Sequence, residues 1–156
     1  MLMSLFICNT LLEHAAPQAL AKKLQAGSGV IASIAVHPSG DHLLVGCEDK
    51  RLLWFDLDLS TKPYKTLRYH DKALRAVAFH PRYPLFASGA DDTQLQVFHG
   101  TVYNDLMSNP LIVPLKTLQG HVVQQHMGVR AAAFHPTQPW LFSGGGDGLA
   151  ALYCNV

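Results

Sequence analysis

The stretch FHPRYPLFASGADDTQLQVF, residues 79–98, contains the pattern that decides the fold. A His-Pro pair is followed by an Asp twelve residues after the His, and an aromatic residue follows that Asp after six more residues. Two short apolar runs, Leu85–Ser88 and Leu95–His99, follow the His-Pro pair. They are separated by a Gly/Asp-rich turn at residues 89–92. The alternating segment Ala73–Phe79 precedes the His-Pro pair. Short alternating runs bounded by turn residues predict antiparallel β-strands.

The same pattern occurs twice more in the chain, in phase and without gaps, at His37-Pro38, Asp49 and Phe55 and at His135-Pro136, Asp147 and Tyr153. The His-Pro pairs are 43 and 55 residues apart. The first spacing lies in the range of about 40–45 residues that is typical of WD repeats, and the second is longer and locates an insertion at residues 101–113. The repeat therefore predicts an all-β fold, a segment of a WD-repeat β-propeller with about three blades.

We divide the chain into repeat units at residues 20–63, 64–113 and 114–156, and interpret residues 1–19 as a strand of a preceding blade. Outer strands are predicted at Leu20–Leu24, Tyr64–Arg68 and Pro114–Leu118. Propellers typically have four to eight blades, so three units predict an incomplete ring. Two explanations stay open. The chain is a fragment of a longer protein, which the exposed strand edges favour, or it completes its ring with another chain.

The composition favours a packed fold and excludes several classes of protein. Hydrophobic residues make up 49% of the chain and charged residues 15%. The net charge of +1 excludes a strong overall attraction to nucleic acid or anionic membranes, although a local patch is compatible with it. The three cysteines (Cys8, Cys47 and Cys154) are far apart, so we expect no disulfide framework and favour a reducing compartment. No phosphate-binding glycine motif is present, and no cofactor is expected.

The apolar opening Met1–Leu12 resembles a signal peptide only superficially. It lacks a basic leading region, and Asn9 and Thr10 interrupt it. No apolar run reaches the roughly 18–20 residues that a membrane-spanning helix needs. We therefore interpret this segment as a core strand and expect no membrane association.

Two His/Asp pairs, His70 with Asp92 and His121 with Asp147, have two interpretations. In WD-repeat proteins the matching His and Asp form a buried hydrogen-bond network with a strand Ser or Thr, here Ser88 and Ser143. Buried polar groups need such partners, so we favour a structural role. A catalytic role would need a separate nucleophile and oxyanion donors, which the sequence does not supply, and we predict no enzyme. A metal site at His121 and His126 has no nearby Cys or carboxylate ligand and is not expected.

Two segments are candidates for binding a partner. The segment Lys62–Arg82 carries several cations against one acid and interleaved tyrosines, a pattern that suits phosphate contact and base stacking on RNA. Its candidate contacts are Lys62, Lys65, Arg68, Lys72, Arg75, Arg82, Tyr64 and Tyr69. The alternative is a solvated outer strand and turns, with Arg75 partly structural. The insertion carries the apolar residues Leu106, Met107, Leu111 and Ile112, which either anchor a protein partner or fold back over the blade edge.

Several segments go beyond a generic WD repeat and resemble the C-terminal part of the propeller in the block-of-proliferation family of eukaryotic ribosome-biogenesis proteins. These segments are Leu52–Tyr64, Lys72–Gly89, Val102–Leu106, Asn109–Pro114 and Phe134–Trp140. The resemblance covers roughly residues 20–153, and the run from residue 54 to residue 139 is the most specific part. The small residues at 131–133 and 149–151 depart from the pattern and predict a thinner core in the third unit.

The resemblance implies a scaffold that acts in maturation of the large ribosomal subunit and its ribosomal RNA, in the nucleus, the nucleolus or the nucleoplasm. It implies the pre-ribosomal particle and a second WD-repeat assembly factor as partners, with ribosomal RNA as a further candidate. The family's long N-terminal region, which engages pescadillo, has no counterpart in this sequence, so the resemblance gives little support for pescadillo binding. A generic WD-repeat adaptor and a truncated, non-functional remnant are the alternative interpretations.

Overall fold

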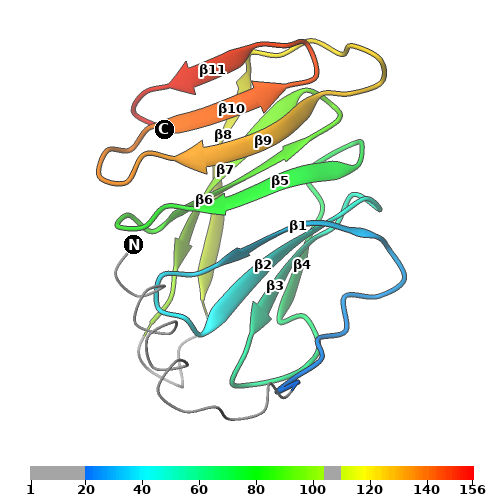
Figure 1. The fold of residues 1–156 in the computed structure, drawn as a ribbon. Coiled ribbons are helices and arrows are strands. Elements are labelled where there is room, and N and C mark those ends of the chain that lie inside the picture. The colour runs from blue at the N-terminus through cyan, green and yellow to red at the C-terminus, as the bar shows by residue number, and fades with distance from the viewer. Residues whose placement is uncertain (1–19, 104–109) are drawn as a thin grey trace, which may run out of the picture.

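The computed structural model describes residues 20–103 and 110–156. The described chain forms eleven β-strands and no helix, and the strands make three antiparallel sheets that are stacked one on another (Figure 1). The predicted all-β propeller segment of three blades is thereby confirmed. The strand predicted for residues 1–19 lies outside the described residues.

Blade 1 has four strands in the order in which they occur along the chain. They are β1 (Ile31–Val36), β2 (His42–Cys47), β3 (Leu52–Asp56) and β4 (Lys65–Leu67). The predicted outer strand at residues 64–68 is present as β4, which pairs with β3 through Lys65 opposite Trp54 and Leu67 opposite Leu52. The second repeat unit therefore begins with the outer strand of the preceding blade.

Blade 2 repeats this order with β5 (Leu74–Phe79), β6 (Leu85–Ala90), β7 (Gln94–Thr101) and β8 (Leu111–Gln119). Blade 3 consists of β9 (Val129–Phe134), β10 (Leu141–Gly145) and β11 (Ala150–Tyr153). No described strand pairs with the free edge of β11. In all three blades one end carries the His-Pro turns and the opposite end carries the turns that contain Asp49, Asp92 and Asp147. We call these the His-Pro end and the Asp-turn end.

The core lies between the blades, because alternating side chains of each sheet point to opposite faces. Trp54 of blade 1 is fully buried against blade 2, with its ring centroid 5.4 Å from that of Phe86. Phe86 stacks on Phe98 at 4.7 Å. The other face of blade 2 buries Leu95 and its neighbours against blade 3, whose fully buried residues include Val129 and Leu141. Blade 2 is thus covered on both faces.

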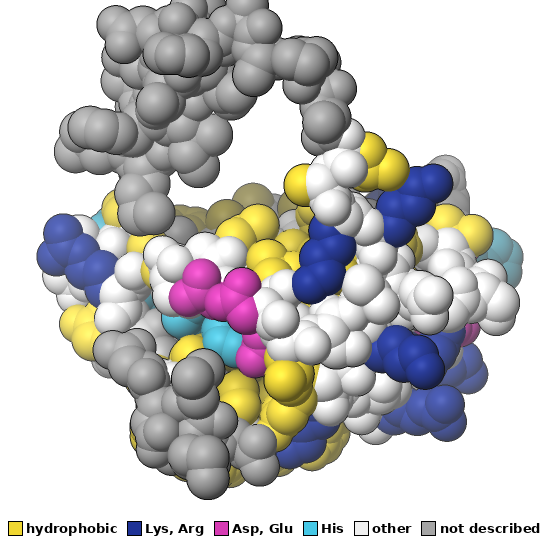
Figure 2. Space-filling model, turned by 90° about the horizontal axis from the view of Figure 1, so that it is seen from below, with side chains coloured by type: hydrophobic (Ala, Val, Ile, Leu, Met, Phe, Trp, Pro, Cys, Tyr) yellow, Lys and Arg dark blue, Asp and Glu magenta, His cyan; other side chains and the backbone are white. Residues whose placement is uncertain are grey.

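The outward faces of blades 1 and 3 carry exposed apolar side chains. Ile34 and Val36 of β1 are 61% and 57% exposed. On the far face of blade 3, Phe142 lies opposite Leu152, and both are exposed. Figure 2, viewed from the side of blade 1, shows hydrophobic side chains on that face, with acidic and His side chains beside them.

One predicted outer strand is absent, and another is present but longer than predicted. Residues 20–30 form no strand; they cross the outward face of blade 1, where Leu24 and Ala26 pack against its apolar residues. The predicted strand would be the outer strand of a preceding blade, and the described residues contain no strand of such a blade. Strand β8 begins at Leu111 rather than Pro114, because residues 111–113 pair with residues 99–101 of β7. The ends of the predicted insertion therefore extend a hairpin.

The three Asp turns share one backbone feature. The residue after each Asp adopts a left-handed conformation, at Lys50 (φ 70°), Thr93 (φ 70°) and Gly148 (φ 79°). This conformation is unstrained for glycine and unfavourable for a β-branched residue. The turn of blade 2 therefore contains local backbone strain at Thr93.

We expect Thr93→Gly to raise the free energy of unfolding by about 0.5–1 kcal/mol, because the steric cost removed exceeds the extra entropy of glycine in the unfolded chain. Urea unfolding of the full chain, followed by circular dichroism, measures the change. The matched variant Gly148→Ala places a side chain in the same position of blade 3 and should lower stability. A Thr93→Gly variant less stable than the parent would contradict this account of the turn.

Candidate functional site

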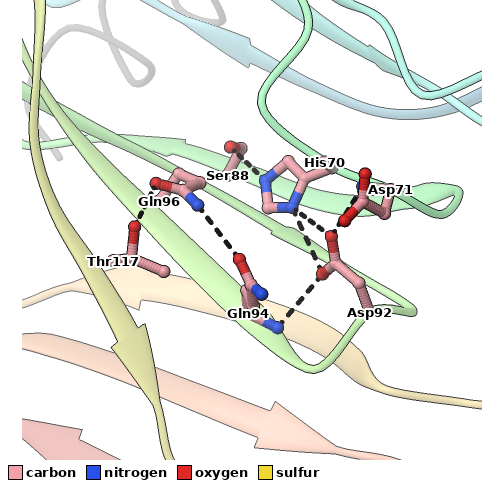
Figure 3. A network of polar contacts seen from close by, with 7 residues as sticks. All are labelled: His70, Asp71, Ser88, Asp92, Gln94, Gln96 and Thr117. Atoms are coloured by element: carbon pink, nitrogen blue, oxygen red, sulfur yellow. Dashed lines mark hydrogen bonds and ion pairs between the residues drawn. The ribbon is translucent and has the colours of Figure 1, made fainter.

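The predicted His/Ser/Asp residues of blade 2 come together in one network at its Asp-turn end (Figure 3). His70 Nε2 lies 2.8 Å from Ser88 Oγ, and His70 Nδ1 lies 3.0 Å from Asp92 Oδ2. The carboxylate can only accept, so Nδ1 carries the proton and Nε2 of the neutral ring accepts from the Ser88 hydroxyl. The Asp92 carboxylate also accepts the backbone N–H groups of Asp71 and Gln94, at 3.0 and 3.1 Å. His70 therefore connects strand β6 to the Asp turn and to the segment that enters blade 2.

Side-chain amides extend the network across the same sheet. Gln96 donates to Gln94 Oε1 at 3.2 Å and accepts from the Thr117 hydroxyl at 2.9 Å (Figure 3). The chain of contacts thus reaches β8. Composition and spacing did not single out these three residues. The alternation of Gln94 and Gln96 with Leu95 and Val97 places both glutamines on one face of β7, and this was the available signal; Thr117 lies opposite Gln96 on β8.

Blade 3 contains an equivalent network. His121 Nε2 lies 2.7 Å from Ser143 Oγ, and His121 Nδ1 lies 3.1 Å from both carboxylate oxygens of Asp147. The backbone N–H groups of Val122 and Leu149 donate to the same carboxylate at 3.1 Å. The two blades therefore use the same three side chains for the same connections.

The hydrogen bonds to Asp92 outweigh its burial. Burial alone would raise the pKa of Asp92, but the His70 ring and two backbone N–H groups stabilise the carboxylate and lower the pKa below its ordinary value of 3.8. Burial likewise opposes ionisation of Asp147, and its four hydrogen bonds lower its pKa as well. Both residues serve as charged acceptors in the folded protein.

The arrangement has the geometry of a Ser/His/Asp triad but not its accessibility. Ser88 is 0% exposed and Ser143 is 4% exposed, since each faces the neighbouring blade. A substrate carbonyl could reach either hydroxyl only if two blades separated. For a metal site, His121 uses both ring nitrogens in the network, and the described residues contain no group of three or more metal-ligating side chains. No helix that could cross a membrane occurs in residues 20–103 and 110–156.

Blade 1 lacks this network. Gly27 and Val45 stand as far before Asp49 as His70 and Ser88 stand before Asp92, so they occupy the His and Ser positions of blade 1. Asp49 pairs instead with Arg51, whose Nε lies 2.7 Å from Asp49 Oδ2 and whose guanidinium also donates to the Ala26 carbonyl. The Asp49–Arg51 pair thus replaces the imidazole as the connection between turn and entering segment.

At the opposite end, each His-Pro turn is capped by its own His. His80 Nδ1 accepts the backbone N–H groups of Arg82 and Tyr83, both at 3.0 Å, so Nε2 carries the proton and donates to the Gln138 carbonyl of blade 3 at 2.8 Å. His37 and His135 accept backbone N–H groups of their turns in the same way. The repeated His-Pro pairs were the signal for this role, which the sequence analysis did not identify.

The predicted basic cluster is divided between the two ends. Arg68 and Lys72 are exposed at the Asp-turn end, whereas Arg82 is exposed at the His-Pro end. Lys62 precedes β4 on the side of the His-Pro turns, and Lys65 lies on the outer strand between them. The cluster is therefore not one continuous patch.

The tyrosines of this segment and Arg75 pack within the fold. Tyr64 is half-buried against the core of blades 1 and 2, and Tyr69 keeps 45% exposure while its ring lies 5.2 Å from that of Phe98. Arg75 pairs with Glu48 of blade 1, and its Nε lies 2.6 Å from Asp91 Oδ2. Asp91 in turn accepts the Gly128 N–H at 3.2 Å. Arg75 thus connects the blades rather than offering a free cation.

The predicted apolar loop is described only in part. Leu106 and Met107 lie outside the described residues. Leu111 is 46% exposed on β8, whereas Ile112 packs against the core between blades 1 and 2. Of the two described residues, Ile112 is the one that folds back over the blade, as one of the two interpretations of the insertion predicts.

We expect Asp92→Asn to destabilise the protein by about 1–3 kcal/mol near pH 6, since it removes a charged acceptor from a buried network. The pKa of Asp92 is lowered in the fold, so the parent keeps this stabilisation above about pH 3.8 and loses it as the pH falls through the folded pKa. The difference between parent and variant should therefore shrink between pH 5 and pH 3 in denaturant unfolding. Asp58→Asn, at an exposed carboxylate, is the control. A difference that stays constant with pH would contradict the assignment.

Comparison with known proteins supports both the repeat and the resemblance. The family described as WD domain, G-beta repeat matches residues 19–56, 61–99 and 112–153. The chain is 64% identical over 141 residues to a ribosome biogenesis protein BOP1 homolog of Chlamydomonas reinhardtii, covering 90% of this chain and 18% of that protein. It is 60% identical over 140 residues to ribosome biogenesis protein BOP1 of Mus musculus, covering 90% of this chain and 19% of that protein.

A fungal relative gives the same result. The chain is 61% identical over 136 residues to ribosome biogenesis protein ERB1 of Malassezia globosa, covering 87% of this chain and 16% of that protein. The predicted resemblance to this group of ribosome-biogenesis proteins is confirmed. The chain spans less than a fifth of the length of these relatives.

Proposed function

Since this chain belongs to the WD40-repeat family, we propose that it is a segment of a binding scaffold that acts in ribosome biogenesis, in maturation of the large ribosomal subunit and its ribosomal RNA. The observation that carries the proposal is the identity of 60–64% to proteins named for ribosome biogenesis in an alga, a mammal and a fungus. That identity extends over about nine tenths of the chain and therefore includes all three blades.

The geometry supports a scaffold rather than an enzyme. Both His/Ser/Asp networks are buried between blades, where they hold turns in place and are closed to substrate. The blades form a stiff support, and the turns at their two ends are open to partners. These observations support our proposal that this segment acts by binding rather than by catalysis.

The partner that we propose is the pre-ribosomal particle, in the nucleus and nucleolus. A second WD-repeat assembly factor is a further proposed partner. Direct contact with ribosomal RNA would depend on Lys62, Lys65, Lys72 and Arg82, which are exposed. Because they are spread over two ends and an outer strand, each would contribute a separate phosphate contact.

Density-gradient sedimentation of a nuclear lysate that contains the tagged full chain tests this function. We expect the chain to co-migrate with large-subunit precursors and to move to the top of the gradient after ribonuclease treatment. Trp54→Ala opens the contact between blades 1 and 2 at a cost of about 3–5 kcal/mol, and this variant should lose the association. Leu59→Ala, at a residue that is 70% exposed, is the matched control and should keep it.

A chain found only at the top of the gradient, with normal circular dichroism, would contradict the ribosomal role. That outcome would favour a general WD-repeat adaptor or a remnant without function.

A further inference from the structure

The Asp-turn end of blade 1 contains a surface hollow of about 520 Å³. Its lining includes Gly27, Ser28, Asp49, Lys50, Arg51 and Arg68. These residues come from three segments: the chain that enters blade 1, the β2–β3 turn and the end of β4. We call this feature the blade 1 hollow.

The blade 1 hollow lies where blades 2 and 3 have their His/Ser/Asp networks. Gly27 stands 22 residues before Asp49, as His70 stands 22 residues before Asp92, and Val45 occupies the position of Ser88. Gly27 has φ +95° and no side chain, and a Cβ built on it would meet the Arg51 guanidinium at 2.7 Å. Arg51 therefore occupies the space beside Gly27 that an imidazole ring fills in the other blades, and its guanidinium lines the hollow.

Cations surround this opening. Lys50, Arg51 and Arg68 face a single carboxylate, Asp49, which leaves an excess of two positive charges in the lining. Arg51 is held by Asp49 and the Ala26 carbonyl, whereas Lys50 and Arg68 form no ion pair within residues 20–103 and 110–156. The hydrogen bond from Arg51, with a further contribution from Arg68, lowers the pKa of Asp49 below its ordinary value. Arg68 thus acts electrostatically on the floor of the hollow.

The turn fixes the backbone around Lys50 and the side chain of Arg51 before any ligand binds. The Cys47 N–H donates to the Arg51 carbonyl at 2.9 Å, which closes the turn around Lys50. Arg51 is further fixed by its contacts with the entering segment. Binding an anion here would therefore order the side chains of Lys50 and Arg68 while the turn and Arg51 keep their positions.

We propose that the blade 1 hollow binds a carboxylate side chain from an acidic segment of a protein partner. The guanidinium of Arg68 presents a planar pair of donors that matches a carboxylate, and Lys50 supplies a second cation from the opposite segment. The proposal depends on the lining of this hollow, which His70 of the segment entering blade 2 completes, and is independent of the ribosomal role.

The layout of charge favours an acidic peptide over RNA. Single-stranded RNA needs a basic groove that follows its backbone over several nucleotides. Here three cations converge on one hollow, whereas Lys62 and Arg82 lie towards the opposite end of the blades, Lys65 lies on the outer strand, and Lys72 and Arg75 do not line the hollow. One carboxylate, or two neighbouring ones, matches an excess of two positive charges.

Fluorescence anisotropy with the full chain and a fluorescein-labelled peptide of ten residues, alternating Glu and Ser, tests the site. We expect saturable binding that is weakened roughly tenfold by Arg68→Gln, the loss expected for one charged hydrogen-bonded contact. Ser28→Glu places a carboxylate at the hollow and should weaken binding at least as much. Ser28→Gln, of equal size and without charge, and Arg82→Gln at the opposite end should both leave it unchanged.

Thermal unfolding of each variant verifies that these exposed substitutions preserve the fold. No binding by the folded parent, or equal binding by the parent and Arg68→Gln, would overturn the proposal. A labelled oligouridylate that binds more tightly than the peptide and loses affinity with Arg68→Gln would overturn it in favour of nucleic acid.

Discussion

Burial of both faces of blade 2 is the constraint on which the rest of the structure depends. A blade has apolar side chains on each face and cannot hide both by itself. Here Phe86 and Phe98 meet Trp54 of blade 1, while Leu95 and Val97 meet Val129 of blade 3. Burying one such large side chain is worth about 1.5–3 kcal/mol, so these two contacts supply much of the driving force for folding. Blades 1 and 3 each have one such face and one that is only partly covered.

Close packing of blades requires that every polar group between them has a partner. Ser88 and His70 lie on the face of blade 2 that meets blade 1, and they bond to each other. Arg75 reaches across the same boundary to Glu48, and His80 reaches across the next boundary to the Gln138 carbonyl. Charged and hydrogen-bonding side chains thus connect neighbouring blades and fix their alignment. Blade 1 departs from this rule at Gly27, where the Arg51 guanidinium takes the place of the imidazole beside a positively charged hollow.

The repeat in the sequence predicted the strands that depend on local pattern and missed the features that depend on distant neighbours. The His-Pro and Asp spacing placed β5, β6 and β7 and the residues of both networks. It could not show that residues 20–24 lack a strand to pair with, or that residues 111–113 extend β8 through their pairing with β7. Strand pairing is set by the partner as much as by the segment itself.

The residues of the candidate site also divide into those that the local sequence pattern predicts and those that depend on neighbours distant in sequence. For Arg75 the sequence left a candidate contact and a partly structural role open, because its partners Glu48 and Asp91 are remote in sequence. The blade 1 hollow, in contrast, was present in the sequence. Gly27 and Val45 occupy the positions of His70 and Ser88 when the first two units are aligned on their turn Asp. Such a departure from a repeat indicates where a structural position has become available for binding.

Native-state amide hydrogen exchange of the full chain, read by mass spectrometry, tests the central place of blade 2 most directly. The account predicts that amides of β6 (Leu85–Ala90), in the middle of the covered sheet, exchange slowest and only through global unfolding. Amides of β11 (Ala150–Tyr153), beside an edge that no described strand covers, should exchange much earlier. Exchange in β6 as fast as in β11 would show that blade 2 is not held between its neighbours, and would contradict the account.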